Sequence, residues 1–202
     1  SGNEEVLRSV GANVHIVCRD RRSYEHVTKH AADASVQLLH DVALYLDIDR
    51  LMATTPAAGF LPAGTMRRRI RLFDRYLVLQ KLQLRWDAIA FRDYAGTGRT
   101  LRCFRNDKES AGHPHPTPNL DISKVLKRSG LLTPDVAARV ARRFLHIIGR
   151  ADKVWTDRLH VAIAGGMLGI PTVFFPGNYF KNRAVFEFSL QQRFPNVDWR
   201  EW

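Results

Sequence analysis

Short apolar runs alternate with polar, helix-compatible stretches near the start of the chain. Residues 13–18 are apolar and β-branched, which is the pattern of a buried strand. Ser23 then stands where it could cap a helix that runs to about His30. A second apolar run at residues 36–39 meets His40-Asp41 and continues over residues 42–46. The pattern predicts a strand, a helix and a second strand.

The middle of the chain carries a different pattern. Residues 54–64 are rich in Pro, Ala and Gly, which predicts a loop or linker. Residues 66–91 place apolar side chains at helical spacing with many arginines between them, so we expect a long basic helix there. A strand is predicted at residues 100–104. The prolines of residues 113–118 cannot continue a helix or a central strand, which predicts a loop.

The C-terminal part has the most regular pattern. Residues 133–135 (Thr-Pro-Asp) form a helix-start signature, and the apolar stripe that follows ends at Gly149. Residues 153–156 then indicate a strand, residues 157–168 a helix and residues 172–175 a second strand. This order predicts a βαβ unit, whose two strands run parallel.

Charged side chains gather directly after three of the predicted strands. Arg19-Asp20 follows the first, residues 105–107 (Arg-Asn-Asp) follow another, and Asp157, Arg158 and His160 follow the first strand of the βαβ unit. In open α/β sheets, ligands bind at the carboxyl ends of the strands, where the next helix presents free amides. Arginine matches a carboxylate or phosphate, and histidine exchanges protons near neutral pH. The pattern favours a site for a small dianion that also reacts.

The same residues have simpler explanations. Arg158 could pair at the surface with Asp157 or Asp152, and His160 could hydrogen-bond a backbone carbonyl. Three further cations fit either an anion site or a solvated surface: Arg19, Arg105 and Lys181. Arg105 with Asp107 and Glu109 could likewise be a charged turn.

Composition narrows the class of protein. With 45% hydrophobic and 25% charged residues among 202, the chain has a globular composition, which excludes collagen-like and wholly disordered proteins. Its 31 Lys and Arg against 20 Asp and Glu leave a net charge of +11, so we expect an anionic partner. The basic helix expected at residues 66–91 could meet nucleic acid or a membrane surface, or could simply be solvated.

Cysteine usage argues against a disulfide framework, and the spacing of His113 and His115 argues against a metal site in their loop. Cys18 and Cys103 are the only cysteines and neither belongs to a CxxC pair, which suits a reducing cytoplasm. His113 and His115 have no Cys or carboxylate spaced to complete a metal site. Neither a secretory leader nor an apolar run of about 18 residues is present, so we expect a cytoplasmic protein.

A combination of motifs resembles the polysaccharide pyruvyltransferase family. It comprises residues 154–160 (Val-Trp-Thr-Asp-Arg-Leu-His), 168–171 (Leu-Gly-Ile-Pro) and 178–181 (Asn-Tyr-x-Lys). Earlier landmarks occur in the family's order: Cys18-Arg19-Asp20 with Ser23-Tyr24, the His40-Asp41 step, and residues 104–109. The resemblance spans nearly the whole chain and corresponds to the C-terminal two-thirds of the family domain.

The resemblance implies an α/β enzyme with Rossmann-like parallel sheets in a GT-B-like arrangement, with a truncated first domain. Residues 1–95 would be the rest of the N-terminal half plus a basic linker helix, and residues 96–202 the C-terminal, donor-binding half. The implied reaction moves pyruvate from phosphoenolpyruvate onto a sugar of a cell-surface polysaccharide or its precursor. The product is a ketal, and phosphate is released.

The family's Arg-Leu-His motif, which contacts phosphoenolpyruvate, falls on Arg158, Leu159 and His160. Arg19 is the counterpart we favour for a further donor-binding arginine, and Arg105 competes with it. Lys181 could complete the anion pocket. The chemistry of the substrate makes His160 the candidate for proton transfer, with Asp107 or Glu109 as a second group. The scheme requires no metal or cofactor.

Two other classes fit the sequence less closely. A GT-B-like glycosyltransferase would use the same basic cleft for a nucleotide sugar, and a nucleic-acid-binding module would use the net charge of +11. We expect no specific nucleic acid as partner, and we expect a sugar or glycolipid acceptor. Peripheral association with the inner face of the membrane would suit such an acceptor.

Overall fold

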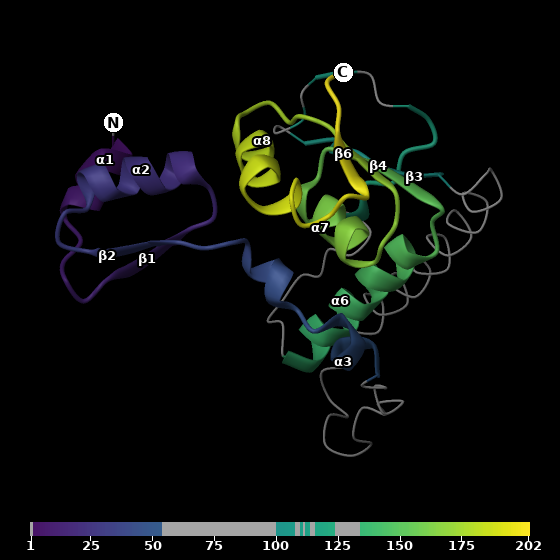
Figure 1. Cartoon of the computed structure of the whole chain (residues 1–202), viewed down its shortest axis with the longest axis horizontal. Helices are drawn as coiled ribbons and strands as arrows, with labels where there is room; N and C mark the ends of the chain where they lie inside the picture. The colour runs from purple at the N-terminus through teal and green to yellow at the C-terminus, as the bar shows by residue number, and fades with distance from the viewer. Residues whose placement is uncertain (1, 54–99, 108–109, 111, 114–115, 124–133) are drawn as a thin grey trace, which may run out of the picture.

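Two parallel sheets form the framework of the computed structural model, which describes residues 2–53, 100–107, 110, 112–113, 116–123 and 134–202. The first sheet pairs β1 with β2, and the second has the strand order β3-β4-β5-β6 (Figure 1). Every neighbouring pair of strands is parallel. The predicted class, α/β with parallel sheets and flanking helices, is confirmed. We call residues 2–53 the N-terminal half and the described residues from 100 onward the C-terminal half.

The N-terminal half is a small β-α-β unit with one extra helix. Its elements are α1 (Gly2–Arg8), β1 (His15–Cys18), α2 (Arg21–His30) and β2 (Ser35–Leu38). Helices α1 and α2 lie on the same face of the strand pair (Figure 1). The cap of α2 is Asp20 and not Ser23, because Asp20 has an extended backbone and its carboxylate accepts from the Ser23 amide at 2.8 Å.

The apolar run at residues 42–46 leaves the first sheet and joins the two halves. It forms the 3-10 helix η1 (Val42–Tyr45), whose N-cap Asp41 accepts a hydrogen bond from the Ala43 amide at 3.1 Å. The short helix α3 (Ile48–Ala53) follows. Leu44 of η1 is buried in a core cluster that otherwise belongs to the C-terminal half. Burial of this side chain anchors the end of the N-terminal half against the second sheet.

The C-terminal half alternates strands and helices as the sequence predicts. Its described elements are β3 (Thr100–Cys103), α6 (Pro134–Gly149), β4 (Lys153–Thr156), α7 (Leu159–Met167), β5 (Thr172–Phe174), α8 (Lys181–Val185), the π-helical turn η2 (Phe186–Leu190) and β6 (Val197–Trp199). The bounds predicted for α6 and β4 are confirmed, as is the parallel β4-α7-β5 unit.

Helix α7 is the centre of this half, because seven of its residues, Leu159 and 161–166, are buried. One side of it packs with α6, β3 and β4, and the other packs with β5, η2 and β6. Gly165 lets the helix approach β5 closely, since a Cβ at this position would collide with the Thr172 hydroxyl. Burial on both sides fixes the residues at the N-terminus of α7.

Helix α7 begins two residues later than predicted. Arg158 has an extended backbone (φ −96°, ψ 116°) and serves as the N-cap, so Asp157 and Arg158 precede the helix. Among the predictions that lie outside the described residues are the loop at 54–64, the basic helix at 66–91, the Thr133 cap, and the domain boundary between residues 95 and 96.

Candidate functional site

The carboxyl ends of β3 and β4 lie next to each other, because Cys103 pairs in register with Thr156. The Thr156 hydroxyl donates to the Cys103 carbonyl at 2.6 Å and accepts from the Arg158 amide at 2.9 Å. These two bonds fix the backbone between β4 and α7 to the neighbouring strand. Arg158 is therefore held at the predicted sheet edge.

The Arg158 side chain lies beside two carboxylates that come from the segments after β3. Its Nη2 donates to Asp121 Oδ1 at 2.6 Å and lies 3.8 Å from Asp107 Oδ2. Arg105 also donates two hydrogen bonds to the Asp107 carboxylate, from Nε to Oδ1 at 2.9 Å and from Nη2 to Oδ2 at 3.1 Å. We call Arg105, Asp107, Asp121 and Arg158 the arginine cluster. Three of its members were predicted site residues.

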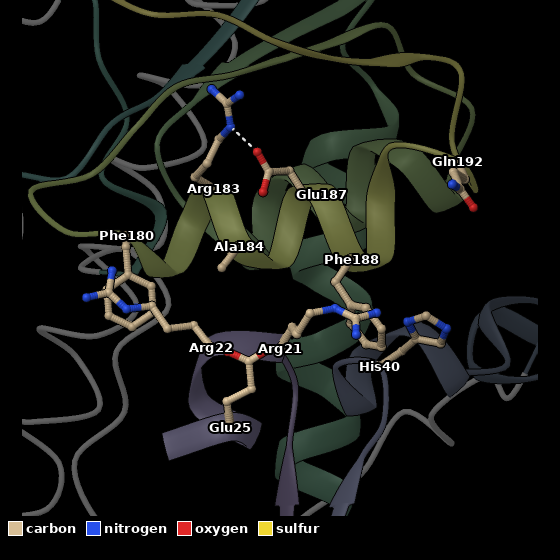
Figure 2. Close-up of a pocket in the computed structure, with 10 residues that line it drawn as sticks. All are labelled: Arg21, Arg22, Glu25, His40, Phe180, Arg183, Ala184, Glu187, Phe188 and Gln192. Atoms are coloured by element: carbon tan, nitrogen blue, oxygen red, sulfur yellow. Dashed lines mark hydrogen bonds and ion pairs between the residues drawn. The ribbon is translucent and has the colours of Figure 1, made fainter. Parts of the chain in front are cut away.

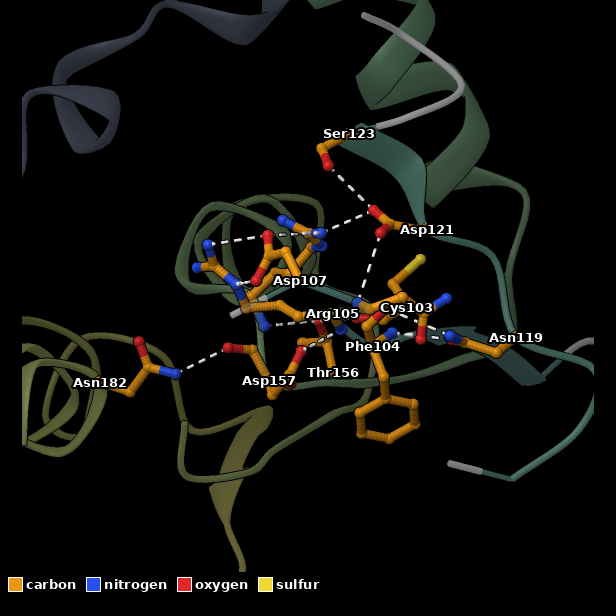
Figure 3. A network of polar contacts seen from close by, with 12 residues as sticks. Cys103, Phe104, Arg105, Asp107, Asn119, Asp121, Ser123, Thr156, Asp157 and Asn182 are labelled. Carbon is orange, nitrogen blue, oxygen red and sulfur yellow. Dashed lines mark hydrogen bonds and ion pairs between the residues drawn. The ribbon is translucent and has the colours of Figure 1, made fainter. Parts of the chain in front are cut away.

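Backbone and side-chain bonds hold the acidic members in place. Ser123 donates to Asp121 Oδ1 at 2.9 Å, and the Asn106 amide donates to Oδ2 at 3.4 Å. Asn119 bonds both the amide and the carbonyl of Phe104, at 2.8 and 3.2 Å. The segment containing Asn119 and Asp121 is thus attached to the end of β3 (Figure 3).

Asp157 ties the same edge to the following strand and helix. Its fully buried carboxylate accepts from the Arg105 amide at 2.9 Å. Its carbonyl oxygen accepts from Asn182 Nδ2 at 2.6 Å, which attaches the start of α8 to the end of β4 (Figure 3). Asp157 therefore ties the segment after β3 and the start of α8 to the end of β4.

Charge in the arginine cluster is nearly balanced in the absence of a ligand. The Arg158 side chain is only 12% exposed, while that of Asp107 is 41% exposed. The buried Nε of Arg158 has no hydrogen-bond acceptor in the described part of the chain. Asp107 is thus the more exposed acid of the cluster, whereas Asp121 is 6% exposed and accepts a further hydrogen bond from Ser123.

His160 faces a second acidic group, which comes from the other half of the molecule. Asp41, the N-cap of η1, is 3% exposed and accepts from Arg19 Nη1 at 2.6 Å. His160 Nε2 lies 3.6 Å from Asp41 Oδ1, and 61% of the His160 side chain is exposed. We call Arg19, Asp41 and His160 the histidine group. It spans the two halves where η1 meets α7.

The pKa of the Asp41 carboxyl lies well below its usual range. His160 beside the carboxylate is the largest cause, and the Ala43 amide and Arg19 add to it, against the opposing effect of burial. Asp41 is therefore ionised at neutral pH. Its carboxylate lies opposite Nε2 of His160, so Nδ1 is the ring nitrogen left for another partner.

Not every predicted site residue lies in these two groups. Leu159 is 9% exposed and packs in the core, so its contribution is to anchor α7. Lys181 is exposed at the start of α8, where its Nζ lies 5.0 Å from the centre of the Tyr179 ring. Glu109 lies outside the described residues. Arg158 pairs with Asp121, whereas the simpler explanation had named Asp157 or Asp152.

Two residues of the site were missed by sequence reasoning. Asp41 was noted as a landmark without a role, although it follows the apolar run at residues 36–39 after a single residue, much as Asp157 follows a strand. Asp121 had no signal, because it follows an irregular proline-rich segment and is 37 positions from Arg158. Arg19 pairs with Asp41, since Asp20 is occupied as the cap of α2.

A cavity of about 710 Å³ lies between α2 and the α8–η2 segment (Figure 2). Arg21 and Arg22 line it from the N-terminal half, and Phe180 and Phe188 from the C-terminal half. Arg22 stacks over the Phe180 ring at 4.1 Å. None of the predicted site residues lines the cavity. His40, which directly precedes Asp41 in the chain, does line it. Nδ1 of His40 lies 3.1 Å from the Ser189 hydroxyl.

None of the helices in the described ranges is both long and apolar enough to cross a membrane.

Comparison with curated proteins gave no significant match. Among solved structures, the chain is similar to a functionally uncharacterised protein from Klebsiella pneumoniae subsp. pneumoniae NTUH-K2044, with a TM-score of 0.61 and 21% identity. The match covers 98% of this chain and 58% of the Klebsiella chain, and it shows a shared fold.

The sequence profile of one family matches most of the chain. The family is described as polysaccharide pyruvyl transferase, and the match covers residues 4–179. This range includes both sheet edges that carry the arginine cluster and the histidine group. The chain belongs to the polysaccharide pyruvyl transferase family.

Proposed function

We propose that the protein transfers pyruvate from phosphoenolpyruvate to a sugar of a polysaccharide or its precursor, forms a ketal and releases phosphate. One observation carries the proposal: Arg158 and His160 both stand at the carboxyl end of β4, and His160 is open to solvent opposite Asp41. An anion-binding group and a proton-transfer group thereby share one sheet edge. Family membership supports this reaction over nucleotide-sugar transfer.

Phosphoenolpyruvate carries a carboxylate and a phosphate on adjacent atoms, so its recognition needs more than one donor. Arg158 and Arg105 supply two guanidinium groups, and the N-terminus of α7 supplies amides and the positive end of its dipole. Asp107 swings away as the donor binds, because its side chain is the more exposed acid of the cluster. Asp121 stays and orients Arg158.

The reaction needs proton transfer in both directions. A proton added to the methylene carbon of the donor makes a methyl group and leaves C2 electrophilic. Two hydroxyls of one sugar add to C2, and the bond from C2 to the phosphate oxygen breaks. One hydroxyl proton replaces the proton given to the methylene carbon, and the other leaves with phosphate. His160 takes a hydroxyl proton at Nδ1, while Asp41 stabilises the imidazolium that forms.

The cavity between α2 and α8 is the proposed entry for the acceptor. His40 lines it, and Asp41 is the next residue along the chain. The aromatic faces of Phe180 and Phe188 can contact a sugar ring, and Arg21 can hold a phosphate on a carrier-linked acceptor (Figure 2). The acceptor would then approach His160 from the side of the N-terminal half.

The test is incubation with phosphoenolpyruvate and a panel of carrier-linked sugars, followed by measurement of phosphate release and of the pyruvate mass increment. His160→Ala should lower both rates by roughly 10²- to 10⁴-fold, the usual contribution of a general acid–base group. The matched control is His146→Ala, an exposed histidine on the last turn of α6. Equal phosphate release by His160→Ala and the control would remove His160 from the mechanism.

Donor binding is tested separately by calorimetry. Arg158→Lys should weaken phosphoenolpyruvate binding, because an ammonium cannot make the paired bonds of a guanidinium. The exposed Arg150→Lys serves as the control. Unchanged affinity in Arg158→Lys would contradict the proposed donor site. A nucleotide sugar that raises Tm more than phosphoenolpyruvate does would instead favour a glycosyltransferase.

A further inference from the structure

Two histidines of α2 lie one helical turn apart on the same face. His26 and His30 occupy positions i and i+4, and the centres of their rings are 4.7 Å apart. This spacing allows two imidazoles of one helix to bind the same metal ion. Both residues lie in the C-terminal part of α2, whereas Arg21 and Arg22 at its start line the cavity. The histidine pair is therefore separate from the site proposed above.

A carboxylate from the neighbouring helix completes the set. Glu4 of α1 faces the pair, and one ligand atom from each of Glu4, His26 and His30 lies within 4.8 Å of the other two. Helices α1 and α2 pack against each other beside the first sheet (Figure 1). The three side chains thus come from two elements that are already in contact.

The chemistry of these ligands selects the class of cation. Two imidazole nitrogens and one carboxylate oxygen suit Zn²⁺ and similar transition metals, whereas Ca²⁺ and Mg²⁺ prefer oxygen ligands alone. Zinc binds such atoms at about 2.0–2.2 Å, so the ligands must draw about 1 Å closer to one another. His26 is exposed and Glu4 is half-buried, which leaves both side chains room to rotate.

We propose that Glu4, His26 and His30 form a binding site for Zn²⁺ or a cation of similar ligand preference, which clasps α1 to α2. Three protein ligands leave a fourth position for water. Val27 follows the first histidine, where metal-dependent hydrolases of this helical spacing carry a glutamate base. The bound cation therefore stabilises the N-terminal half and does not catalyse hydrolysis.

An ion pair competes with the metal for Glu4. Arg8 Nη2 lies 3.9 Å from Glu4 Oε2, one turn further along α1. The site exchanges this weak, exposed contact for a metal bond. Removal of Arg8 should therefore strengthen metal binding, an effect that a purely structural role for these residues would not produce.

The experiment measures Zn²⁺ binding to the whole 202-residue chain after treatment with a chelator. Titration against a chromophoric chelator should give one equivalent bound, and Co²⁺ should give the visible absorption bands of a four-coordinate site. Tm should rise with Zn²⁺ concentration, because the cation binds the folded state.

Variants identify the ligands. His26→Ala, His30→Ala and Glu4→Gln should each weaken Zn²⁺ binding by more than the roughly 10- to 100-fold that loss of an outer-sphere partner costs. His15→Ala is the matched control, since His15 is an exposed histidine of the same half outside the cluster. Arg8→Gln should bind Zn²⁺ more tightly than the unaltered chain.

Circular dichroism of each variant without metal checks that its fold is retained, and these surface substitutions should leave it unchanged. The proposal is overturned if the unaltered chain binds Zn²⁺ no better than the triple variant Glu4→Gln, His26→Ala, His30→Ala. It is also overturned if His15→Ala lowers binding as much as His26→Ala does.

Discussion

The two halves of the molecule are built from the same pieces but differ in how much they bury. Helix α2 of the N-terminal half has no buried residue, whereas α7 of the C-terminal half is buried over most of its length. Val17 on β1 is 53% exposed, and Val154 on β4 is fully buried. A two-stranded parallel pair with one helical layer has little core of its own. The C-terminal half is therefore the rigid part of the described chain.

The difference in burial between the two halves affects the candidate site, because each half contributes residues to it. The C-terminal half holds Arg158 through buried bonds to Thr156 and Asp121. The N-terminal half presents Asp41 at the end of a small sheet, attached through the burial of Leu44. We therefore expect Arg158 and Asp121 to keep their positions when a ligand binds, and we expect Asp107 and the N-terminal half to adjust.

Each half contains one cysteine, which allows the comparison to be tested directly. Burial raises the pKa of the Cys103 thiol far above its usual range, and burial followed by the charge of Asp20 raises that of Cys18. Both thiols should react only after local or global opening. Cys18 should label roughly 100-fold faster than Cys103, because the N-terminal half has the smaller core and should open at a lower free energy. Each 1.4 kcal/mol of difference in opening free energy changes the labelling rate by a factor of ten.

The labelling is followed under native conditions with a thiol reagent, and the modified peptide is identified by mass spectrometry. Labelling in full denaturant gives the intrinsic rate of each thiol. Equal protection of Cys18 and Cys103 would mean that the two halves open together and that the comparison is wrong.

The valines on the two sheets provide a matched pair of substitutions. Val154→Ala should cost about 2–3 kcal/mol of unfolding free energy, through lost burial and the cavity left in the core. Val17→Ala should change it by no more than about 0.5 kcal/mol. Urea unfolding followed by circular dichroism measures both. A loss for Val17→Ala similar to that for Val154→Ala would indicate that β1 is covered in solution.

Glycine substitutions measure how closely the helices pack. Gly165→Ala should destabilise the protein by about 1–3 kcal/mol, because its Cβ would collide with Thr172 between α7 and β5. Gly11→Ala meets only the end of the Asn13 side chain at 3.3 Å, so its effect should be near zero. Tm values of the two variants decide the matter, and a neutral Gly165→Ala would show that α7 can move away from β5.

The smallest expected effect concerns the contact between the halves. Asp41→Asn should cost about 1 kcal/mol at neutral pH, because the charged bonds from Arg19 and His160 become neutral ones. The folded pKa of Asp41 is depressed, so its stabilisation is present above the unfolded pKa near 3.9 and is lost as pH falls through the folded pKa. The stability gap between the two proteins should shrink below about pH 4.

Denaturant unfolding at several pH values between neutral and acid follows this gap. Asp33→Asn provides a control for the loss of one carboxylate, since Asp33 lies in an exposed turn of the same half. A gap that stays constant with pH would mean that Asp41 acts as a helix cap alone, without its charge.

Sequence reasoning predicted the strands and helices where local pattern decides the outcome. Helix α6 runs from Pro134 to Gly149 as expected, because a proline at its first position and an apolar stripe act locally. The N-cap of α2 was misplaced by three residues, since both Asp20 and Ser23 are good caps and the two hydrogen-bond each other. Such a choice depends on the backbone angle at a single residue.

The site was predicted less completely than the fold. The strand-end rule placed Arg105, Asp107 and Arg158 at one edge, and the structure brings them together. Sequence reasoning could not predict contacts between distant segments. Asp121 contacts Arg158 and Asp41 contacts His160, and no periodicity in the sequence connects these segments. These contacts follow from tertiary packing, which a single sequence does not encode in a readable pattern.

The hydroxyl of Thr156 gives protein engineering a way to alter the arginine cluster indirectly. It receives the Arg158 amide and reaches across to the carbonyl of Cys103, entirely inside the sheet. A shape-conserving exchange to valine would remove both of these hydrogen bonds, yet it would alter no side chain of the arginine cluster. The position of Arg158 can therefore be altered from Thr156, a buried residue that a screen of surface residues would miss.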